Sequence, residues 1–381
     1  MSETIERPKI LMIAGESSGD HHGATLIRAL RVKNPLIEVI GTGGTHMLSA
    51  GQRQLFDMTE HAVVGLIEVG KHYTKFRRFF QQLLTLALTE KPKAIVLIDY
   101  PGFNLRFAEA IKRQAPGIPV IQYISPQVWA WKSGRAKAME ASLDSVMTIF
   151  PFEQEWLQKH APRLQVKWVG HPTMDRLLPI AEEYRDEKRI ALLPGSRADE
   201  LKKHFPILFK AAHLMSQRIP DLKFVWVAPD EKTFELGNEL LNEFSRSAIH
   251  LESYIGYSLT HLSRCKLAMV ASGTASLECA LAGTPPIVVY KVNPFTFAVG
   301  KRLVKVKHLS MINVLAKESL VPELLQKDLT APRLAQETHR LLIDTVRYQM
   351  IRERMKKIVE TLGEPGVAER AADWVLSRIQ G

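Results

Sequence analysis

Short runs of β-branched and other apolar residues alternate with helical stretches along most of the chain, and this alternation constrains the fold more than any other feature. Typical runs are Lys9–Ala14, Ala94–Asp99 and Arg189–Leu193. Between them lie segments such as Phe103–Ala115, whose apolar residues recur every three to four positions. Strand–helix alternation with connections of this size predicts parallel sheets with right-handed crossovers. The expected fold class is therefore α/β, with doubly wound sheets.

Two series of strand candidates are separated by the polar and charged segment Pro172–Lys188, which we interpret as a linker. We expect an N-terminal Rossmann-like domain over residues 1–175 and a second Rossmann-like domain over residues 188–345. Strand candidates stop after about residue 330. Residues 346–381 are expected to form C-terminal helices that pack back on the N-terminal domain.

The charge balance favours an anionic partner. The chain has 51 Lys and Arg against 40 Asp and Glu, a formal charge of +11. Nucleic acid, an acidic membrane surface and phosphorylated substrates all fit this excess. The sequence has no zinc-finger, basic-zipper or aromatic-glycine RNA pattern, so we expect no nucleic acid. Its apolar runs are shorter than the roughly 20 residues that cross a bilayer, and two cysteines, Cys265 and Cys279, make no disulfide framework. A cytoplasmic protein is expected.

The first strand candidate runs into the glycine loop Gly15-Glu16-Ser17-Ser18-Gly19. This loop fits the G-x-S-x-G elbow of serine hydrolases, with Ser17 as nucleophile. In those enzymes the elbow follows several strands, whereas here it follows the first. The loop matches neither the P-loop nor the dinucleotide motif, so neither ATP nor NAD is expected. Two interpretations fit this position better than a hydrolase, which stays the third. Ser17, Ser18 and Gly19 present backbone N–H groups to a polar or anionic group, or the glycines only serve a tight turn.

Two loops of the second strand series favour a nucleotide-diphosphate pocket. In Leu193-Pro194-Gly195-Ser196-Arg197 the guanidinium of Arg197, next to Ser196, can pair two phosphate oxygens. The segment 270–278 places small residues at a helix N-terminus that suits a pyrophosphate, and a glutamate one turn later can reach ribose hydroxyls. The alternatives are a surface ion pair for Arg197 and an ordinary capped helix for the segment 270–278. The candidates in this segment are Gly273, Thr274, Ala275, Ser276 and Glu278.

These loops belong to an ordered set of motifs that resembles the lipid-A-disaccharide synthase family. The most specific motif is Ser125-Pro126-Gln127-Val128-Trp129-Ala130-Trp131. The others span residues 14–20, 98–104, 192–197, 271–278, 291–296 and 310–315, so the resemblance covers nearly the whole chain. The one local departure is His21-His22, where an apolar pair would be more usual.

The resemblance implies a GT-B glycosyltransferase of lipid A biosynthesis, with two Rossmann-like domains facing a cleft. The implied substrates are a UDP-sugar donor, UDP-2,3-diacylglucosamine, and an acylated glucosamine phosphate acceptor, 2,3-diacylglucosamine 1-phosphate. The implied products are UDP and a β-1,6-linked disaccharide. No cofactor is expected, and a homodimer is kept as a candidate assembly.

A β-linked product from an α-linked donor requires one in-line displacement, with a base for the acceptor hydroxyl and stabilisation of the departing UDP. Asp99 is the favoured base because it ends an apolar strand at the sheet edge where ligands bind in open α/β sheets. Glu16 and Asp20 are competing carboxylates, and a helix-capping Asp99 is the alternative. No two aspartates stand two apart, so no metal site of the Asp-x-Asp type is expected. The resemblance, more than spacing, suggests that Asn313 reaches the donor sugar.

Residues 63–88 are the candidate contact with an anionic membrane on the inner face of the inner membrane. Apolar positions from Phe76 to Ala87 recur at helical spacing, with lysines and arginines among them, as in helices that lie on such surfaces. The same stripe is typical of a core helix. The candidate acyl-chain and membrane contacts are Val64, Leu66, Ile67, Val69 and Phe76.

Overall fold

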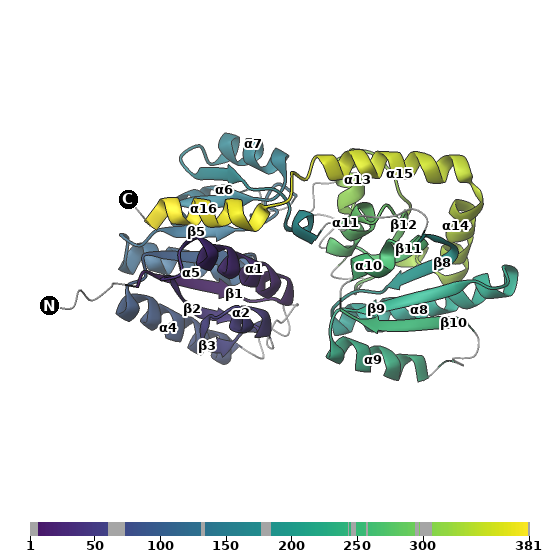
Figure 1. The fold of residues 1–381 in the computed structure, drawn as a ribbon, viewed down its shortest axis with the longest axis horizontal. Coiled ribbons are helices and arrows are strands. Elements are labelled where there is room, and N and C mark those ends of the chain that lie inside the picture. The colour runs from purple at the N-terminus through teal and green to yellow at the C-terminus, as the bar shows by residue number, and fades with distance from the viewer. Residues whose placement is uncertain are drawn as a thin grey trace. The chain divides into compact units, whose positions relative to one another are not determined.

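The structure, a computed structural model, describes residues 7–59, 73–130, 134–176, 184–242, 244, 249–256, 258–293, 297 and 307–379. The chain forms two compact units, residues 1–176 with 362–381 and residues 177–361. Each unit is a parallel sheet with helices between successive strands (Figure 1). This architecture confirms the α/β fold class that the strand–helix alternation predicts.

The first unit contains a seven-stranded sheet in the order β3-β2-β1-β4-β5-β6-β7. Its strands are β1 (Lys9–Ala14), β2 (Glu38–Gly43), β3 (Arg53–Asp57), β4 (Ala94–Ile98), β5 (Val120–Tyr123), β6 (Ser145–Thr148) and β7 (Gln165–Trp168). Its helices are α1 (Ser17–Lys33), α2 (Thr45–Ser49), α4 (Tyr73–Glu90), α5 (Pro101–Gln114), α6 (Arg135–Ser142), α7 (Pro151–His160), the 3-10 turn η2 (Pro172–Arg176) and α16 (Val367–Ile379).

The core of this unit is apolar on both faces of the sheet, as expected for parallel strands covered by helices. Every residue of β4 is fully buried. On one face the aromatic rings of α4 and α5 pack together, with Phe80 and Phe107 edge-on at 5.7 Å between centroids. Removing a ring as buried as Phe107 would cost about 3–5 kcal/mol. This rigid sheet holds the loops at its carboxyl edge.

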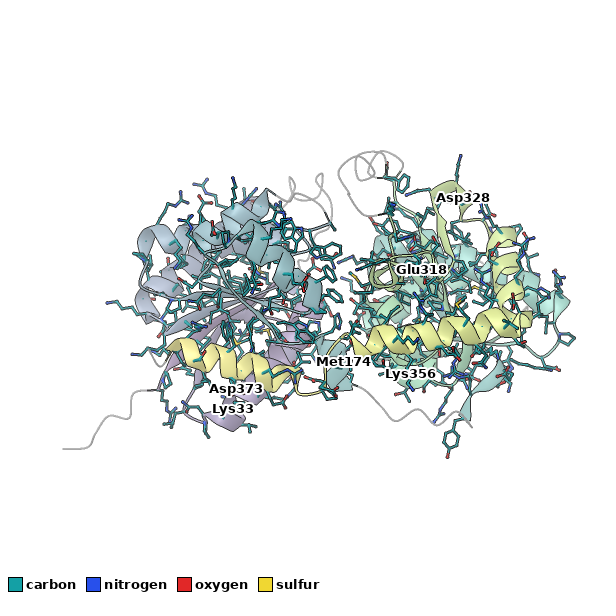
Figure 2. All side chains as sticks on the ribbon, turned by 90° about the horizontal axis from the view of Figure 1, so that it is seen from above. Lys33, Met174, Glu318, Asp328, Lys356 and Asp373 are labelled. Carbon is teal, nitrogen blue, oxygen red and sulfur yellow. The ribbon has the colours of Figure 1, made fainter. Side chains whose placement is uncertain are left out.

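Helix α16 returns the chain to the first unit and packs against α1. The carboxylate of Asp175 accepts hydrogen bonds from the N–H groups of Gly366, Val367 and Ala368, at 2.8, 2.8 and 2.9 Å, and so caps the start of the helix. Lys33 of α1 and Asp373 of α16 form an ion pair at 2.7 Å (Figure 2).

The second unit contains a six-stranded parallel sheet in the order β10-β9-β8-β11-β12-β13. Its strands are β8 (Asp186–Leu193), β9 (Lys223–Ala228), β10 (His250–Ile255), β11 (Cys265–Ala271), β12 (Pro286–Tyr290) and β13 (Glu323–Leu325). Its helices are α8 (Ala198–Arg218), α9 (Glu231–Asn242), α10 (Ser258–Leu262), α11 (Thr274–Leu281), α13 (Met311–Ala316), the turn η5 (Gln326–Asp328), α14 (Ala331–Ile343) and α15 (Thr345–Glu360).

The C-terminal helices divide between the units, which differs from the expectation for residues 346–381. Helix α15 packs against α11, α13 and α14 of the second unit, and only α16 joins the first. The apolar stripe of α15, with Tyr348, Ile351 and Met355, is buried in the second unit. None of the helices in the described part of the chain is long and apolar enough to span a membrane.

Candidate functional site

In the first unit, two of the predicted loops meet where the strand order reverses. The reversal lies between β1 and β4, which are neighbours with Ala14 beside Ile98. Loops at the carboxyl ends of such strands form the ligand-binding crevice of open α/β sheets. The approach is close, because a Cβ atom on Gly15 would lie 2.4 Å from a ring carbon of Tyr100. The first glycine loop and the Asp99 turn are therefore one local structure.

The turn that carries Asp99 has an unusual backbone. Asp99 and Tyr100 both adopt left-handed conformations, with φ of 46° and 45°. Each such residue other than glycine costs about 1–2 kcal/mol. Conformations of this kind persist only where the surroundings impose them, and they cluster at active sites. The strained turn therefore supports a functional role for Asp99.

Glu16 lies beside the same turn, whereas Asp20 has a structural role. Burial, and then the nearby charge of Glu16, raise the pKa of the Tyr100 hydroxyl. Asp20 is only 3% exposed. Its carboxylate accepts hydrogen bonds from the N–H groups of Gly44, His46 and Met47, at 2.7, 3.0 and 2.9 Å, and so anchors the start of α2. This engagement makes Asp20 the weakest of the three candidate bases.

The first turn of α1 contains the remaining residues of this loop. Ser17 and Ser18 are exposed, and Gly19 is buried against β1 and β4. A Cβ atom on Gly19 would lie 3.5 Å from the Cβ of Ala14, so this glycine leaves the helix close to the strands without strain. The exposed N-terminus of α1 thus borders the Asp99 turn and can receive a polar or anionic group.

The Ser-Pro-x-Val-Trp motif is fixed by a buried acid that the sequence interpretation missed. Glu153, in the first turn of α7, accepts a hydrogen bond from Trp129 Nε1 at 2.9 Å. It also accepts from the N–H groups of Ile149 and Phe150, both at 3.2 Å. Burial raises the pKa of the Glu153 carboxyl to about 7. Trp131 of the motif lies outside the described residues.

The second unit repeats the arrangement, with the strand order reversing between β8 and β11. Leu193 lies beside Val270, so the loops that follow them are neighbours. Gly195 and Gly273 have φ of 121° and 157°, in a region that side chains rarely adopt. Helices α8 and α11 begin directly after these loops, so two helix N-termini with partial positive charge are available for an anion.

Arg197 stands at the N-cap position of α8. Its side chain is 48% exposed, and Nη1 donates to Glu200 Oε1 at 3.1 Å. An exposed ion pair of this type contributes little to stability, so the guanidinium can exchange this carboxylate for a phosphate at small cost. Ser196, beside it, is exposed as well.

His204 is a further residue that the sequence interpretation missed. It is fully buried on α8, and burial lowers the pKa of its imidazole. Its Nε2 accepts from the N–H of Lys291 at 2.9 Å, so Nδ1 carries the proton and donates to the carbonyl of Pro194 at 2.8 Å. His204 therefore ties the loop after β8 to the end of β12.

In helix α11, which follows the loop after β11, Ser276 and Glu278 are partly engaged within the protein. The hydroxyl of Ser276 donates to the carbonyl of Gly273 at 2.8 Å, which shapes the turn. The carboxylate of Glu278 accepts from the hydroxyl of Ser258. Thr274 is exposed in the first turn of α11, and Ala275 is partly exposed. The backbone of this turn is thus the part best placed for a pyrophosphate.

Asn313 differs from the expectation that it reaches a sugar. Its Nδ2 donates to the carbonyl of Val321 at 2.9 Å and to Glu323 Oε1 at 2.8 Å, and its Oδ1 accepts from the N–H of Val321 at 2.9 Å. Glu323 also accepts from Ser310, through its N–H at 2.9 Å and its hydroxyl at 2.8 Å. In this conformation Asn313 and Glu323 join α13 to β13.

The candidate membrane segment is described only in its helical part. Val64, Leu66, Ile67 and Val69 lie outside the described residues. Phe76 is half-buried and packs edge-on against Phe79, with 6.5 Å between ring centroids. Phe79, Leu83, Leu84 and Ala87 are buried in the core, so for this part of the stripe the core interpretation holds. Within the ranges that the structure describes, no group of three His, Cys, Asp or Glu is placed to hold a metal ion.

Comparisons with known proteins agree with the motifs over nearly the full length. A family model described as lipid-A-disaccharide synthetase matches residues 10–377. The lipid-A-disaccharide synthase of Geobacter metallireducens is 35% identical over 385 residues, covering 99% of this chain and 98% of that protein. The lipid-A-disaccharide synthase of Myxococcus xanthus is 35% identical over 378 residues, covering 97% of each.

Solved structures agree with the fold. The UDP-GlcNAc 2-epimerase from Neisseria meningitidis, bound to UDP-GlcNAc, has a TM-score of 0.63 at 14% identity, covering 97% of this chain and 100% of that chain. A Medicago truncatula protein complexed with UDP-glucose has a TM-score of 0.61 at 13% identity, with full coverage of both chains. At such identities the likeness extends to the fold alone, and it confirms two Rossmann-like domains of the GT-B type.

Proposed function

Because the chain belongs to the lipid-A-disaccharide synthase family, a family of glycosyltransferases, we propose that it joins UDP-2,3-diacylglucosamine to 2,3-diacylglucosamine 1-phosphate. The products are UDP and a β-1,6-linked disaccharide 1-phosphate. The observation that carries this proposal is the family match over residues 10–377, together with a loop pair at the strand reversal of each sheet. The loop pair of the first unit contains the carboxylates of Glu16 and Asp99. The loop pair of the second unit contains Arg197 and the N–H groups of two helix N-termini. Transfer from a nucleotide sugar requires both kinds of group.

The second unit binds the UDP-sugar in this proposal. The N-termini of α8 and α11 face the pyrophosphate, and Arg197 leaves Glu200 to pair with its oxygens. Negative charge develops on UDP as the glycosidic bond breaks, so fixed N–H dipoles and a guanidinium stabilise the transition state more than the ground state. In other glycosyltransferases a divalent cation neutralises the charge of the departing UDP. Here the N–H groups and Arg197 take this role, so we expect the reaction to need neither metal nor cofactor.

The first unit binds the acceptor and supplies the base. Asp99 accepts the proton of the acceptor's 6-hydroxyl as that oxygen attacks the anomeric carbon from the face opposite UDP. One displacement inverts the configuration, so an α-linked donor gives a β-linked product without a covalent intermediate. Glu16 is the second candidate for the base because it lies beside the same turn.

The acyl chains of both substrates favour action at a membrane. Moving a chain fully into water costs about 0.8 kcal/mol per methylene, so an active site near the lipid surface avoids a large penalty. We propose that Val64, Leu66, Ile67 and Val69, with Phe76 at the edge of the segment, contact the anionic inner face of the inner membrane. A homodimer is a further proposal that rests on the family resemblance.

A transfer assay with both substrates tests the proposed reaction. Release of UDP should require the acceptor, and a labelled glucosamine should appear in a disaccharide. The variant Asp99→Ala should lower turnover by about 10²-fold or more, while UDP affinity stays near that of the wild type, since a general base contributes about this factor to the chemical step. Release of UDP without the acceptor would overturn the proposal. Hydrolysis of the acyl groups that depends on Ser17 would overturn it in favour of a hydrolase.

A further inference from the structure

Two buried side-chain amides lie beneath the Asp99 turn, in a core that is mainly apolar. Gln122 is in the middle of β5, is fully buried, and is paired in register with Leu97 and Val146. Asn104, in the first turn of α5, is also fully buried. A polar residue in a central parallel strand is costly unless its hydrogen bonds are made.

Both amides donate to the same carbonyl group. Asn104 Nδ2 donates to the carbonyl of Asp99 at 2.7 Å and to that of Ile98 at 3.2 Å. Gln122 Nε2 also donates to the carbonyl of Asp99, at 3.1 Å. The same Nε2 lies within hydrogen-bond distance of the carbonyls of Tyr123 and Ile124, at 3.3 and 3.2 Å. The carbonyl of Asp99 is thus held from two elements at once.

The left-handed turn explains why these donors are needed. The N–H of Asp99 still donates to the carbonyl of Tyr123 on β5, at 3.1 Å. The left-handed backbone of Asp99 and Tyr100 then turns the chain away from the strand direction, and the two side-chain amides hold the carbonyl of Asp99. Ile124, after the adjacent strand, is left-handed as well, with φ of 65°. Carbonyl groups shielded from water require a donor, and Asn104 and Gln122 supply donors to this half-buried turn.

Holding the turn has a cost that stability alone does not explain. The oxygens Asn104 Oδ1 and Gln122 Oε1 are buried and have no hydrogen-bond partner among the described residues. Apolar residues in place of Gln122 and Asn104 would avoid the unpaired oxygens, and glycine in the turn would avoid the backbone strain. Unpaired buried oxygens and left-handed backbone at residues other than glycine occur most often at functional sites.

We infer that Gln122, together with Asn104, is a positioning residue that fixes the backbone of Asp99 and hence the direction in which its carboxylate leaves the chain. The role rests on the proposed transferase function, in which Asp99 is the base. Because base catalysis depends on sub-ångström placement of the accepting oxygen, loosening the turn should lower the chemical step and leave the binding of UDP unchanged.

The test compares Gln122→Met with the matched control Gln52→Met in the full-length protein. Gln52 is also a buried glutamine of the first unit, its Nε2 donates to a strand carbonyl, that of Met12, at 3.0 Å, and its Oε1 is likewise unpartnered. Methionine keeps the size of the side chain and removes the N–H donors. Both variants should lose similar stability in urea denaturation.

We expect kcat of Gln122→Met to fall at least tenfold, with KM for the donor and UDP affinity within twofold of the wild type. Gln52→Met should keep kcat, per folded molecule, within twofold. If Gln122→Met does not fold, Asn104→Ala removes the 2.7 Å bond to the same carbonyl and should show the same loss of kcat. Equal kcat in the Gln122 and Gln52 variants would overturn the inference, whereas an inactive wild type would instead refute the proposed function.

Discussion

Replacing Asp20 by alanine should destabilise the first unit without removing the catalytic group. The substitution leaves the N–H groups of Gly44, His46 and Met47 without their acceptor. His46 is exposed, so its N–H can turn to water, but Gly44 and Met47 are buried. Each buried unpaired N–H costs about 1–3 kcal/mol, so the free energy of unfolding should fall by about 4 kcal/mol.

Asparagine at this position separates the structural role from a catalytic one. Asp20→Asn keeps an oxygen for Gly44 and Met47, both bonded to Oδ1, and loses only the acceptor of His46. We expect it to cost about 1 kcal/mol and to leave turnover per folded molecule within a few-fold of the wild type. Asp99→Asn should show the opposite pattern, with little loss of stability and about 10²-fold lower turnover.

Urea denaturation gives the stability of each variant, and the transfer assay gives its turnover, corrected for the folded fraction. The reasoning fails if Asp20→Asn is as stable as the wild type and yet loses about 10²-fold in turnover. That result would make Asp20 the base, and its three hydrogen bonds to backbone N–H groups would then contribute little to stability.

Four further predictions concern the donor site, the need for a metal, acid stability and the membrane. Arg197→Ala should weaken UDP binding about tenfold or more, as expected for a lost charged hydrogen bond. The wild type should keep its activity in excess EDTA. Complete loss of activity that Mg²⁺ restores would refute the metal-free mechanism. Burial lowers the pKa of His171 from 6.5 to about 3, so its contribution to stability is complete above pH 6.5 and is lost as the pH falls towards 3. Urea denaturation should therefore show that the free energy of unfolding falls between pH 7.5 and pH 5.5 by about 1.4 kcal/mol less in His171→Asn than in the wild type. An equal fall in the two proteins would contradict this. If the membrane segment contacts lipid, serine substitutions should release folded protein from membrane pellets, and an unfolded or aggregated variant would defeat the assignment. The positions to substitute are Val64, Leu66, Val69 and Phe76.

The central strands could be predicted from the sequence because burial on both faces requires continuous apolar runs, as in Ala94–Ile98. Apolar runs do not predict three of the strands, β3, β10 and β13. All three lie at sheet edges, and their residues are mostly half-buried or exposed, so the apolar signal is weak. The position of α15 was missed as well, because an amphipathic stripe shows that a helix packs but not on which unit.

For the candidate site, the loops were predictable and the partners of individual side chains were not. Glycine loops between strand and helix are local patterns, and parallel topology then brings them to one edge of a sheet. The roles of Asp20 and Asn313 depend on backbone groups contributed by other elements, which no local pattern encodes. Gln122 did leave a signal, since it is a polar residue in an otherwise apolar buried strand. His204 left a weaker one, as a polar residue on the face of α8 that also contains Leu201, Phe205 and Leu208. Such residues hold loop carbonyls in both units.

The anomeric configuration and linkage of the product test the central claim most directly. The disaccharide formed from UDP-2,3-diacylglucosamine and 2,3-diacylglucosamine 1-phosphate should be characterised by NMR, from the one-bond carbon–hydrogen coupling at the new anomeric centre and the correlations across the glycosidic bond. A single displacement with Asp99 as base predicts a β configuration joined to the 6-oxygen of the acceptor. An α-linked product would contradict the single displacement, and a bond to any other hydroxyl would contradict the proposed placement of the acceptor.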